Sequence, residues 1–156
     1  MAMQNPPQGY HTVTPYLVMD NSAAAIDFYR KAFGAEEIFR FEHEGRIGHA
    51  ELRIGDSRIM LSDEWPEYGY RSARNIGATP VSLMLYVPNV DEVFARALEA
   101  GATERSPVQD QFYGDRTGNL SDPFGHQWTI GTHVKDVPAE DMQRLFRESM
   151  AGQAAT

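Results

Sequence analysis

Apolar residues occur in the same order in two halves of the chain. In the first half an apolar run at 14–19 precedes a segment at 22–33 whose apolar residues recur at helical spacing (Ala25, Phe28, Tyr29 and Ala32). Three strand-like runs follow at 36–43, 47–54 and 57–63, separated by short turns. The pattern predicts a strand, a helix and three strands, with Asn21 or Ser22 capping the helix and Gly34 ending it.

The second half repeats this order. An apolar run at 81–87 precedes a helical pattern at 89–101, which begins at the capping residue Asn89. Three more strands are expected at 103–110, 114–122 and 126–132, the middle one broken by Gly118. A last helix at about 138–150 carries one apolar face (Met142, Leu145, Phe146 and Met150). The repeat predicts two βαβββ modules followed by a C-terminal helix.

These elements predict how the chain is divided. We expect a flexible N-terminal tail at 1–11, paired βαβββ modules within 12–135, and a C-terminal helix and tail at 136–156. The modules cover 12–63 and 81–133, with a linker at 64–80.

Alternation within the strands separates two faces in each module. In 47–54, Ala50, Leu52 and Ile54 face one way, whereas His49, Glu51 and Arg53 face the other. In the second module, Leu83 and Leu85 oppose Ser82, Met84 and Tyr86, and Trp128 and Ile130 oppose Gln127 and Thr129. The aliphatic faces should cover the helices, and the mixed faces should line a cavity.

Composition excludes several classes of function. A net charge of −8 argues against nucleic acid as a partner. The absence of cysteine excludes disulfides, thiolate zinc sites and a cysteine nucleophile. No apolar run approaches the roughly 20 residues of a membrane span, and no secretory signal is visible, so we expect no membrane partner and a cytoplasmic protein.

Three stretches resemble the vicinal oxygen chelate superfamily, which includes glyoxalase I, extradiol dioxygenases and bleomycin and fosfomycin resistance proteins. They are YLVMDNSAAAIDFYRKAFGAEE (16–37), HAELRIGDSRIMLSDE (49–64) and GDRTGNLSDPFGHQWTI (114–130). The last two are most similar to its PhnB-like branch. The resemblance implies an α+β fold in which the curled mixed sheets of two βαβββ modules surround a cavity.

Metal-using members of this superfamily place His, Glu or Gln at four positions, one on the first and one on the fourth strand of each module. Spacing from the matching motifs carries these positions onto Val13, Met60, Ser82 and Thr129. Valine has no donor atom, and methionine is a poor ligand for hard divalent metals. The resemblance therefore implies a protein without the usual metal site and with no cofactor.

His49 and Glu51 are the most suggestive polar pair. They share one strand face two residues apart, so they could form an acid–base pair, two ligands of a relocated metal, or a structural pair with Arg53 balancing Glu51. His126 lies in the DPFGH turn at 122–126, where we expect a histidine bonded to nearby backbone. Asp115 and Arg116 could form a salt bridge at the cavity mouth or meet an anionic ligand.

Aromatic residues near the expected cavity openings favour a flat or cationic ligand. They are Trp65, Tyr68, Tyr70, Phe112 and Tyr113, although packing of the linker or of a dimer seam would explain them equally. The predicted ligand contacts are His49, Glu51, Met60, Trp65, Ser82, Tyr86, Phe112, Arg116, Gln127 and Thr129.

Three functions remain open. The leading hypothesis is a small-molecule-binding protein that sequesters a drug or metabolite. The alternative is a metal-dependent lyase, isomerase or dioxygenase with relocated ligands that include His49 and Glu51. The third is an interaction or scaffold protein with a filled cavity. We also expect a homodimer, because the C-terminal helix has an apolar face to cover.

Overall fold

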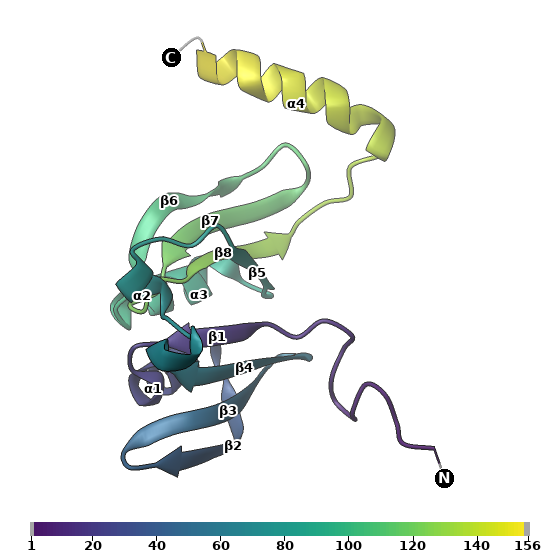
Figure 1. Cartoon of the computed structure of the whole chain (residues 1–156). Helices are drawn as coiled ribbons and strands as arrows, with labels where there is room; N and C mark the ends of the chain where they lie inside the picture. Colours follow the sequence, from purple (N-terminus) through teal and green to yellow (C-terminus); the bar gives the residue numbers. More distant parts are fainter. Residues whose placement is uncertain (1, 155–156) are drawn as a thin grey trace.

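The first module is a four-stranded sheet with one helix (Figure 1). The computed structural model describes residues 2–154. The module consists of β1 (Tyr16–Met19), α1 (Ser22–Phe33), β2 (Glu36–His43), β3 (Arg46–Ile54) and β4 (Ser57–Asp63). The strand order is β1-β4-β3-β2, with β1 parallel to β4 and the other pairs antiparallel. We call this sheet A.

The second module repeats that topology as sheet C. It consists of β5 (Ser82–Tyr86), α3 (Val90–Glu99), β6 (Thr103–Asp110), β7 (Asp115–Ser121) and β8 (Gln127–His133). The order β5-β8-β7-β6 matches that of sheet A, again with the first strand parallel to the last. The predicted α+β fold of two βαβββ modules is thereby confirmed.

The predicted break at Gly118 is wrong, because β7 runs through this residue without interruption. A methyl group added at Gly118 would lie 2.8 Å from both the Phe94 ring of α3 and the Val108 side chain of β6. Glycine is therefore needed here for close packing of the sheet on α3, and the backbone has no turn at this point.

Helix α1 begins at Asn21, whose side-chain oxygen accepts from the amide of Ala24. It ends at Gly34, which adopts the left-handed conformation (φ 68°). In the second module the Asn89 side chain caps α3 in the same way, accepting from the amide of Glu92. The same local signals thus start both helices.

The two modules share one hydrophobic core in which α1 and α3 pack together. Asp122, at the start of the turn before β8, is buried in this core. Its carboxylate accepts hydrogen bonds from the Tyr29 hydroxyl of α1 at 2.5 Å and from Trp128 Nε1 at 2.9 Å. It also accepts from the amides of Phe124 and His126 at 2.9 and 3.0 Å. One carboxylate therefore joins the first helix to the last turn of the second sheet.

The connection between the modules contains a short 3₁₀ turn (Pro66–Tyr68) and α2 (Ala73–Ile76). The Glu64 carboxylate accepts from the Ser72 amide and the Asn75 side chain, at 2.6 and 2.7 Å. These donors, the Ser72 amide first, lower the pKa of Glu64. The segment is thereby tied to the end of β4.

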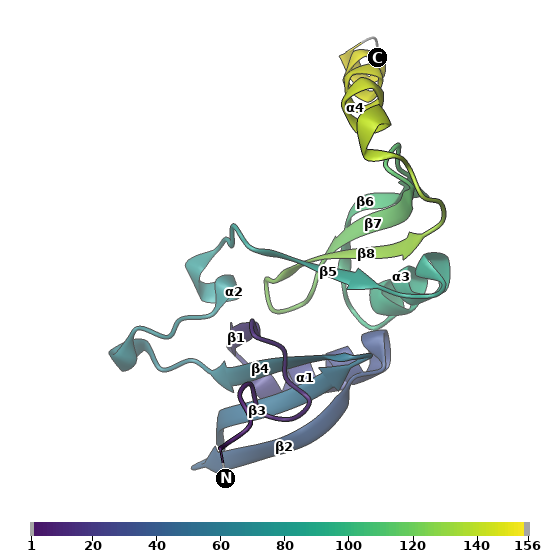
Figure 2. The ribbon, with the colours of Figure 1, turned by 90° about the vertical axis from the view of Figure 1, so that its right-hand side faces the viewer.

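Helix α4 (Ala139–Ala154) projects away from both sheets, as Figures 1 and 2 show. None of its described residues is buried, and the Phe146 ring meets Phe112 of the β6–β7 turn with centroids 6.0 Å apart. Within residues 2–154 no helix is long and apolar enough to cross a membrane.

Candidate functional site

His49 is the centre of a hydrogen-bonded chain on the mixed face of sheet A. Its Nδ1 lies 2.8 Å from the Tyr16 hydroxyl, and its Nε2 lies 3.2 Å from Glu51 Oε1. An ionised carboxylate can only accept, so in a neutral imidazole at this position Nε2 carries the hydrogen and Nδ1 accepts from Tyr16. The predicted His49–Glu51 pair is present, and the structure adds Tyr16 to it.

Aromatic rings surround His49 on this face. The centroids of Tyr16, Phe39 and Phe41 lie 5.4, 5.8 and 5.6 Å from that of the imidazole. The sequence prediction missed all three residues. The signal was available for the two phenylalanines, since Phe39 and Phe41 alternate within 36–43 and therefore share a strand face.

A recess of about 480 Å³ opens at one end of this face. It is lined by Tyr16, Val18, Gly48, Ser62, Trp65 and Tyr70. The backbones of Trp65 and Tyr70 bond to each other in an isolated bridge, and the Arg46 guanidinium lies 3.8 Å from the Trp65 ring centroid. The volume lies in the range of small-molecule sites, which are typically about 300–1,000 Å³.

The N-terminal segment crosses sheet A beside Glu51. The Arg58 guanidinium carbon lies 4.8 Å from the centroid of the Tyr10 ring. Burial, and then the nearby Glu51 carboxylate, raise the pKa of the Tyr10 hydroxyl. Glu51 itself is only 9% exposed, so its charge lies beneath the aromatic face.

The mixed face of sheet C has a different polar chain. The Tyr86 hydroxyl donates to Asp115 at 2.8 Å, and the Asp115 carboxylate lies 2.7 Å from His133 Nδ1. His133 Nε2 lies 2.7 Å from Asp136, which follows β8. The bond to Asp115 raises the pKa of Tyr86, and the bonds to Asp136 and then Asp115 raise that of His133.

Several other residues of this face are neutral hydrogen-bonding groups. Thr129 donates to Asn119 at 2.6 Å, and Ser121 donates to Gln127 at 3.1 Å. Ser82 pairs with Gln127 in the ladder between β5 and β8. Sheet C therefore offers amides and hydroxyls where sheet A offers aromatic rings.

The structure does not bring the ten predicted ligand contacts together. Of these, Trp65 alone lines the recess on sheet A. Met60 lies opposite Tyr16 and Glu51 in the strand register, so it shares their neighbourhood. Ser82, Tyr86, Gln127 and Thr129 lie on sheet C.

Phe112 and Arg116 do not lie at the centre of the mixed face of either sheet. Phe112 packs against Tyr113 and Phe146, with ring centroids 5.2 and 6.0 Å apart. Arg116 binds Asp91 and Asp110 at 2.8 and 3.2 Å. The structure thus explains both residues by contacts within the chain.

Two ion pairs that the sequence left open do not form. Arg53 pairs with Glu36 of β2, so it does not balance Glu51. Asp115 and Arg116 do not pair with each other, because neighbouring residues of an extended strand point to opposite faces. Asp115 instead pairs with His133, and Arg116 pairs with Asp91.

His126 bonds to backbone, as the turn motif indicates, but to a carbonyl far away in the sequence. Its Nε2 lies 3.2 Å from the Val18 carbonyl oxygen of β1, so this ring nitrogen is the donor. Its own amide donates to Asp122 in the turn. His126 therefore connects the two modules.

The four positions at which the superfamily's metal ligands would stand do not fit a metal. Val13 precedes β1 and is 83% exposed, and Met60, Ser82 and Thr129 supply no imidazole or carboxylate. Among residues 2–154, no group of three or more His, Asp or Glu side chains is arranged to hold a metal ion. Both ring nitrogens of His49 are engaged by Tyr16 and Glu51.

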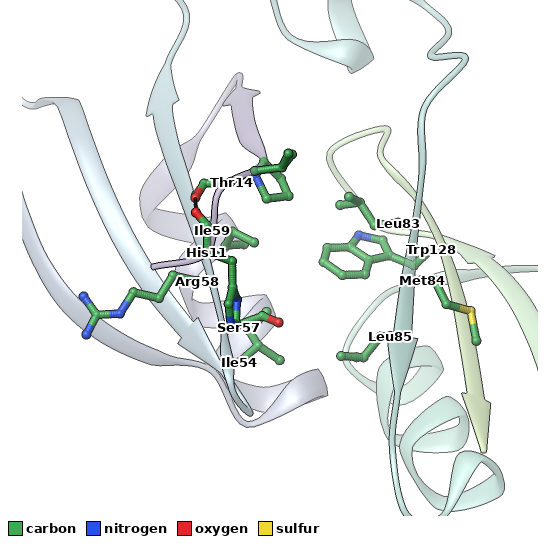
Figure 3. A pocket seen from close by; sticks show the side chains of 12 residues that line it. His11, Thr14, Ile54, Ser57, Arg58, Ile59, Leu83, Met84, Leu85 and Trp128 are labelled. Carbon is green, nitrogen blue, oxygen red and sulfur yellow. Dashed lines mark hydrogen bonds between the residues drawn. The ribbon is translucent and has the colours of Figure 1, made fainter. Parts of the chain in front are cut away.

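A smaller cavity of about 150 Å³ lies between the modules (Figure 3). The side chains of Ile54, Ile59, Leu83, Leu85 and Trp128 face it from both sides. Arg58 also contributes to its wall, but its guanidinium points away. This seam is apolar and offers few groups that could orient a polar ligand.

Comparison with known proteins identifies relatives across most of the chain. Residues 10–130 match the family model of the Glyoxalase/Bleomycin resistance protein/Dioxygenase superfamily. An uncharacterised protein of Mycobacterium tuberculosis is 44% identical over 135 residues, covering 84% of this chain and 79% of that protein. The protein YjdN of Escherichia coli is 27% identical over 150 residues, covering 82% and 99%.

Solved structures show the same fold. TioX from Micromonospora sp. ML1 superimposes with a TM-score of 0.65 and 27% identity, covering 80% of this chain and 99% of TioX. The PhnB protein from Bacillus cereus superimposes with a TM-score of 0.60 and 19% identity, covering 78% and 99%.

Proposed function

Since the chain belongs to the glyoxalase/bleomycin resistance protein/dioxygenase superfamily, we propose that it binds a small molecule and sequesters a drug or metabolite without the usual metal. The observation that carries this proposal is the recess of about 480 Å³ on sheet A, bounded by Tyr16, Trp65 and Tyr70. We place the protein in the PhnB-like branch of the superfamily, which the stretches at 49–64 and 114–130 favour.

The guest is a neutral or cationic, partly aromatic molecule. Aromatic faces attract flat rings and cations, and the Glu51 carboxylate lies beneath the same face. The net charge of −8 raises the encounter rate of cations over anions. Arg53 and Arg116, the arginines best placed by sequence to hold an anion, are paired with Glu36 and with Asp91 and Asp110.

Calorimetry on the full chain tests this assignment. A planar cationic dye and a bleomycin-type glycopeptide should bind, and salt should weaken their binding, whereas methylphosphonate should not bind. Trp65→Leu should weaken dye binding at least tenfold. Tyr68→Leu is the matched control, because Tyr68 is 75% exposed and does not line the recess.

The opposite ranking would overturn the proposal. Binding of methylphosphonate alone, abolished by Arg46→Ala, would assign the recess to anions, because the Arg46 guanidinium lies over the Trp65 ring that lines it. Binding of no guest, together with unchanged Trp65 emission, would favour an interaction protein.

A further inference from the structure

We propose that Tyr16 is a catalytic acid–base residue, which removes and returns a proton on a planar, enolisable carbonyl compound held in the sheet A recess. His49 and Glu51 act through Tyr16 as positioning residues. This inference rests on the proposed function, because it uses the same recess and the same class of flat, uncharged guest.

The hydrogen bonds that link Tyr16, His49 and Glu51 all run in one direction. Glu51 accepts from His49 Nε2, which leaves Nδ1 as an acceptor for the Tyr16 hydroxyl at 2.8 Å. A phenol bonded to an imidazole that a carboxylate orients has the arrangement by which enzymes activate a hydroxyl group. Tyr16 can therefore pass its proton to His49 without rearrangement of the site.

The exposure of the side chains places Tyr16, the reacting residue, at the solvent-facing end of the hydrogen-bonded series Tyr16–His49–Glu51. Glu51 is 9% exposed and Tyr16 is 45% exposed, so the carboxylate is buried, whereas Tyr16 is exposed and is one of the residues that line the recess. The charge that forms on His49 during proton transfer would be stabilised by the buried carboxylate and by the faces of Phe39 and Phe41.

The proton transfer balances without a further reactant. The Tyr16 oxygen takes a proton from the carbon next to the carbonyl, while the phenolic proton moves to His49 Nδ1. The electron pair of the broken C–H bond enters the enolate, and the imidazolium is paired with Glu51. Return of a proton from Tyr16 to the enolate, and from His49 to Tyr16, gives the starting ketone or its tautomer.

The corresponding chain on sheet C lacks this property. There Tyr86 donates directly to the Asp115 carboxylate, which raises the pKa of its hydroxyl and holds its proton. His133 lies beyond Asp115 and accepts nothing from Tyr86. The imidazole between phenol and carboxylate is therefore what distinguishes sheet A.

The proton transfer needs an Nδ1 of His49 that carries no hydrogen, because only then can the imidazole accept from the Tyr16 hydroxyl. The ionisable groups around this chain are Tyr16 from β1, Glu51 from β3, Arg58 from β4 and Tyr10 from the N-terminal segment. β2 contributes the uncharged rings of Phe39 and Phe41.

Deuterium exchange into 2-tetralone, a neutral bicyclic ketone, tests the proposal on the full chain. Proton NMR in deuterated buffer follows loss of the signal next to the carbonyl, with buffer alone as reference. We expect the protein to accelerate exchange and Tyr16→Phe to lower the enzymatic rate about 100-fold, within the usual range for general acid–base catalysis. His49→Gln and Glu51→Gln should lower the rate, and Glu51→Gln should change its pH profile.

His43→Gln is the matched control, because His43 is exposed at the end of β2 and paired with Glu44. Quenching of tryptophan emission, with Trp65→Leu as the reference for the Trp128 signal, measures binding separately, and Tyr16→Phe should still bind 2-tetralone. If exchange is not accelerated at the solubility limit of 2-tetralone, the proposed proton transfer through Tyr16 and His49 is overturned, whether or not 2-tetralone binds. If the planar dye also fails to bind, the proposed function fails too.

A second readout needs no ligand. Nitrogen NMR of the imidazole should show hydrogen on Nε2 of His49 and none on Nδ1 at neutral pH. A tautomer with hydrogen on Nδ1 of His49 would falsify the proposed proton transfer even if exchange were observed.

Discussion

At the scale of single residues, Asp122 has the largest predicted effect on stability. It is buried and accepts four hydrogen bonds, two of them on Oδ2 from Tyr29 and Trp128. Asp122→Asn places an NH₂ group against at least one of these donors, leaving buried polar groups unpaired. We expect a loss of about 2–4 kcal/mol in the free energy of unfolding by urea denaturation. The exposed Asp56→Asn is the control, and equal stability of both variants would contradict this account.

Tyr29→Phe tests the same contact through its pH dependence. Burial, and then the Asp122 charge, raise the pKa of Tyr29 well above its ordinary value. A group whose pKa is raised in the folded state stabilises it below the unfolded value, about 10, and loses that contribution as pH rises through the folded value. We expect the wild type to lose stability above about pH 10, and Tyr29→Phe to lose less. Parallel pH profiles would argue against this contribution.

The residues of the site could be predicted from the sequence only in part. Alternation placed His49 and Glu51 on one face, because strand geometry has a strict period of two. Tyr16 was not predicted, because its meeting with His49 depends on the register between β1, β4 and β3. The partner of Arg53 also depends on register, which is why Glu36 replaced Glu51.

At the scale of elements, His133 ties the end of β8 to the segment that leads into α4. Its two ring nitrogens lie 2.7 Å from Asp115 and Asp136, so both bonds need the protonated ring. The two carboxylates raise its pKa, Asp136 first, and the stabilisation is therefore complete below about pH 6.5 and lost as pH rises through the folded value. We expect proton NMR to show a raised titration midpoint for the His133 ring, and we expect Asp136→Asn to lower it. If Asp136→Asn left the titration midpoint of His133 unchanged, the proposed bond between His133 and Asp136 would be excluded.

The elements themselves were predictable because their signals are local. Capping by Asn21 and Asn89 and the helical spacing of apolar residues set α1 and α3. Gly118 was misjudged because its role depends on Phe94 and Val108, which lie on other elements. The short helix α2 has too few residues for a periodic pattern, and its start depends on Glu64 as well as Ser72.

At the scale of the whole molecule, the arrangement of the modules was the least predictable feature. Family resemblance implied one cavity between two sheets, but the recess on sheet A includes no residue of sheet C. The helices α1 and α3, together with the Tyr29–Asp122 and His126–Val18 hydrogen bonds, set how the modules pack. Each of these contacts joins distant parts of the chain, so no local pattern reports it.

The open surfaces of the chain lead to the last prediction, a homodimer. No described residue of helix α4 is buried, and Phe146 and Met150 on its apolar face are 48% and 49% exposed. An apolar stripe on a projecting helix favours a partner, and closed two-fold pairs are the commonest assembly. We expect sedimentation at micromolar concentration to show a dimer that Phe146→Glu combined with Met150→Glu weakens at least tenfold. Arg147→Gln, an exposed substitution on the same helix, should leave the dimer intact. A wild-type chain that sediments only as a monomer would exclude the dimer, and each chain would then have to bind its guest in a recess open to solvent.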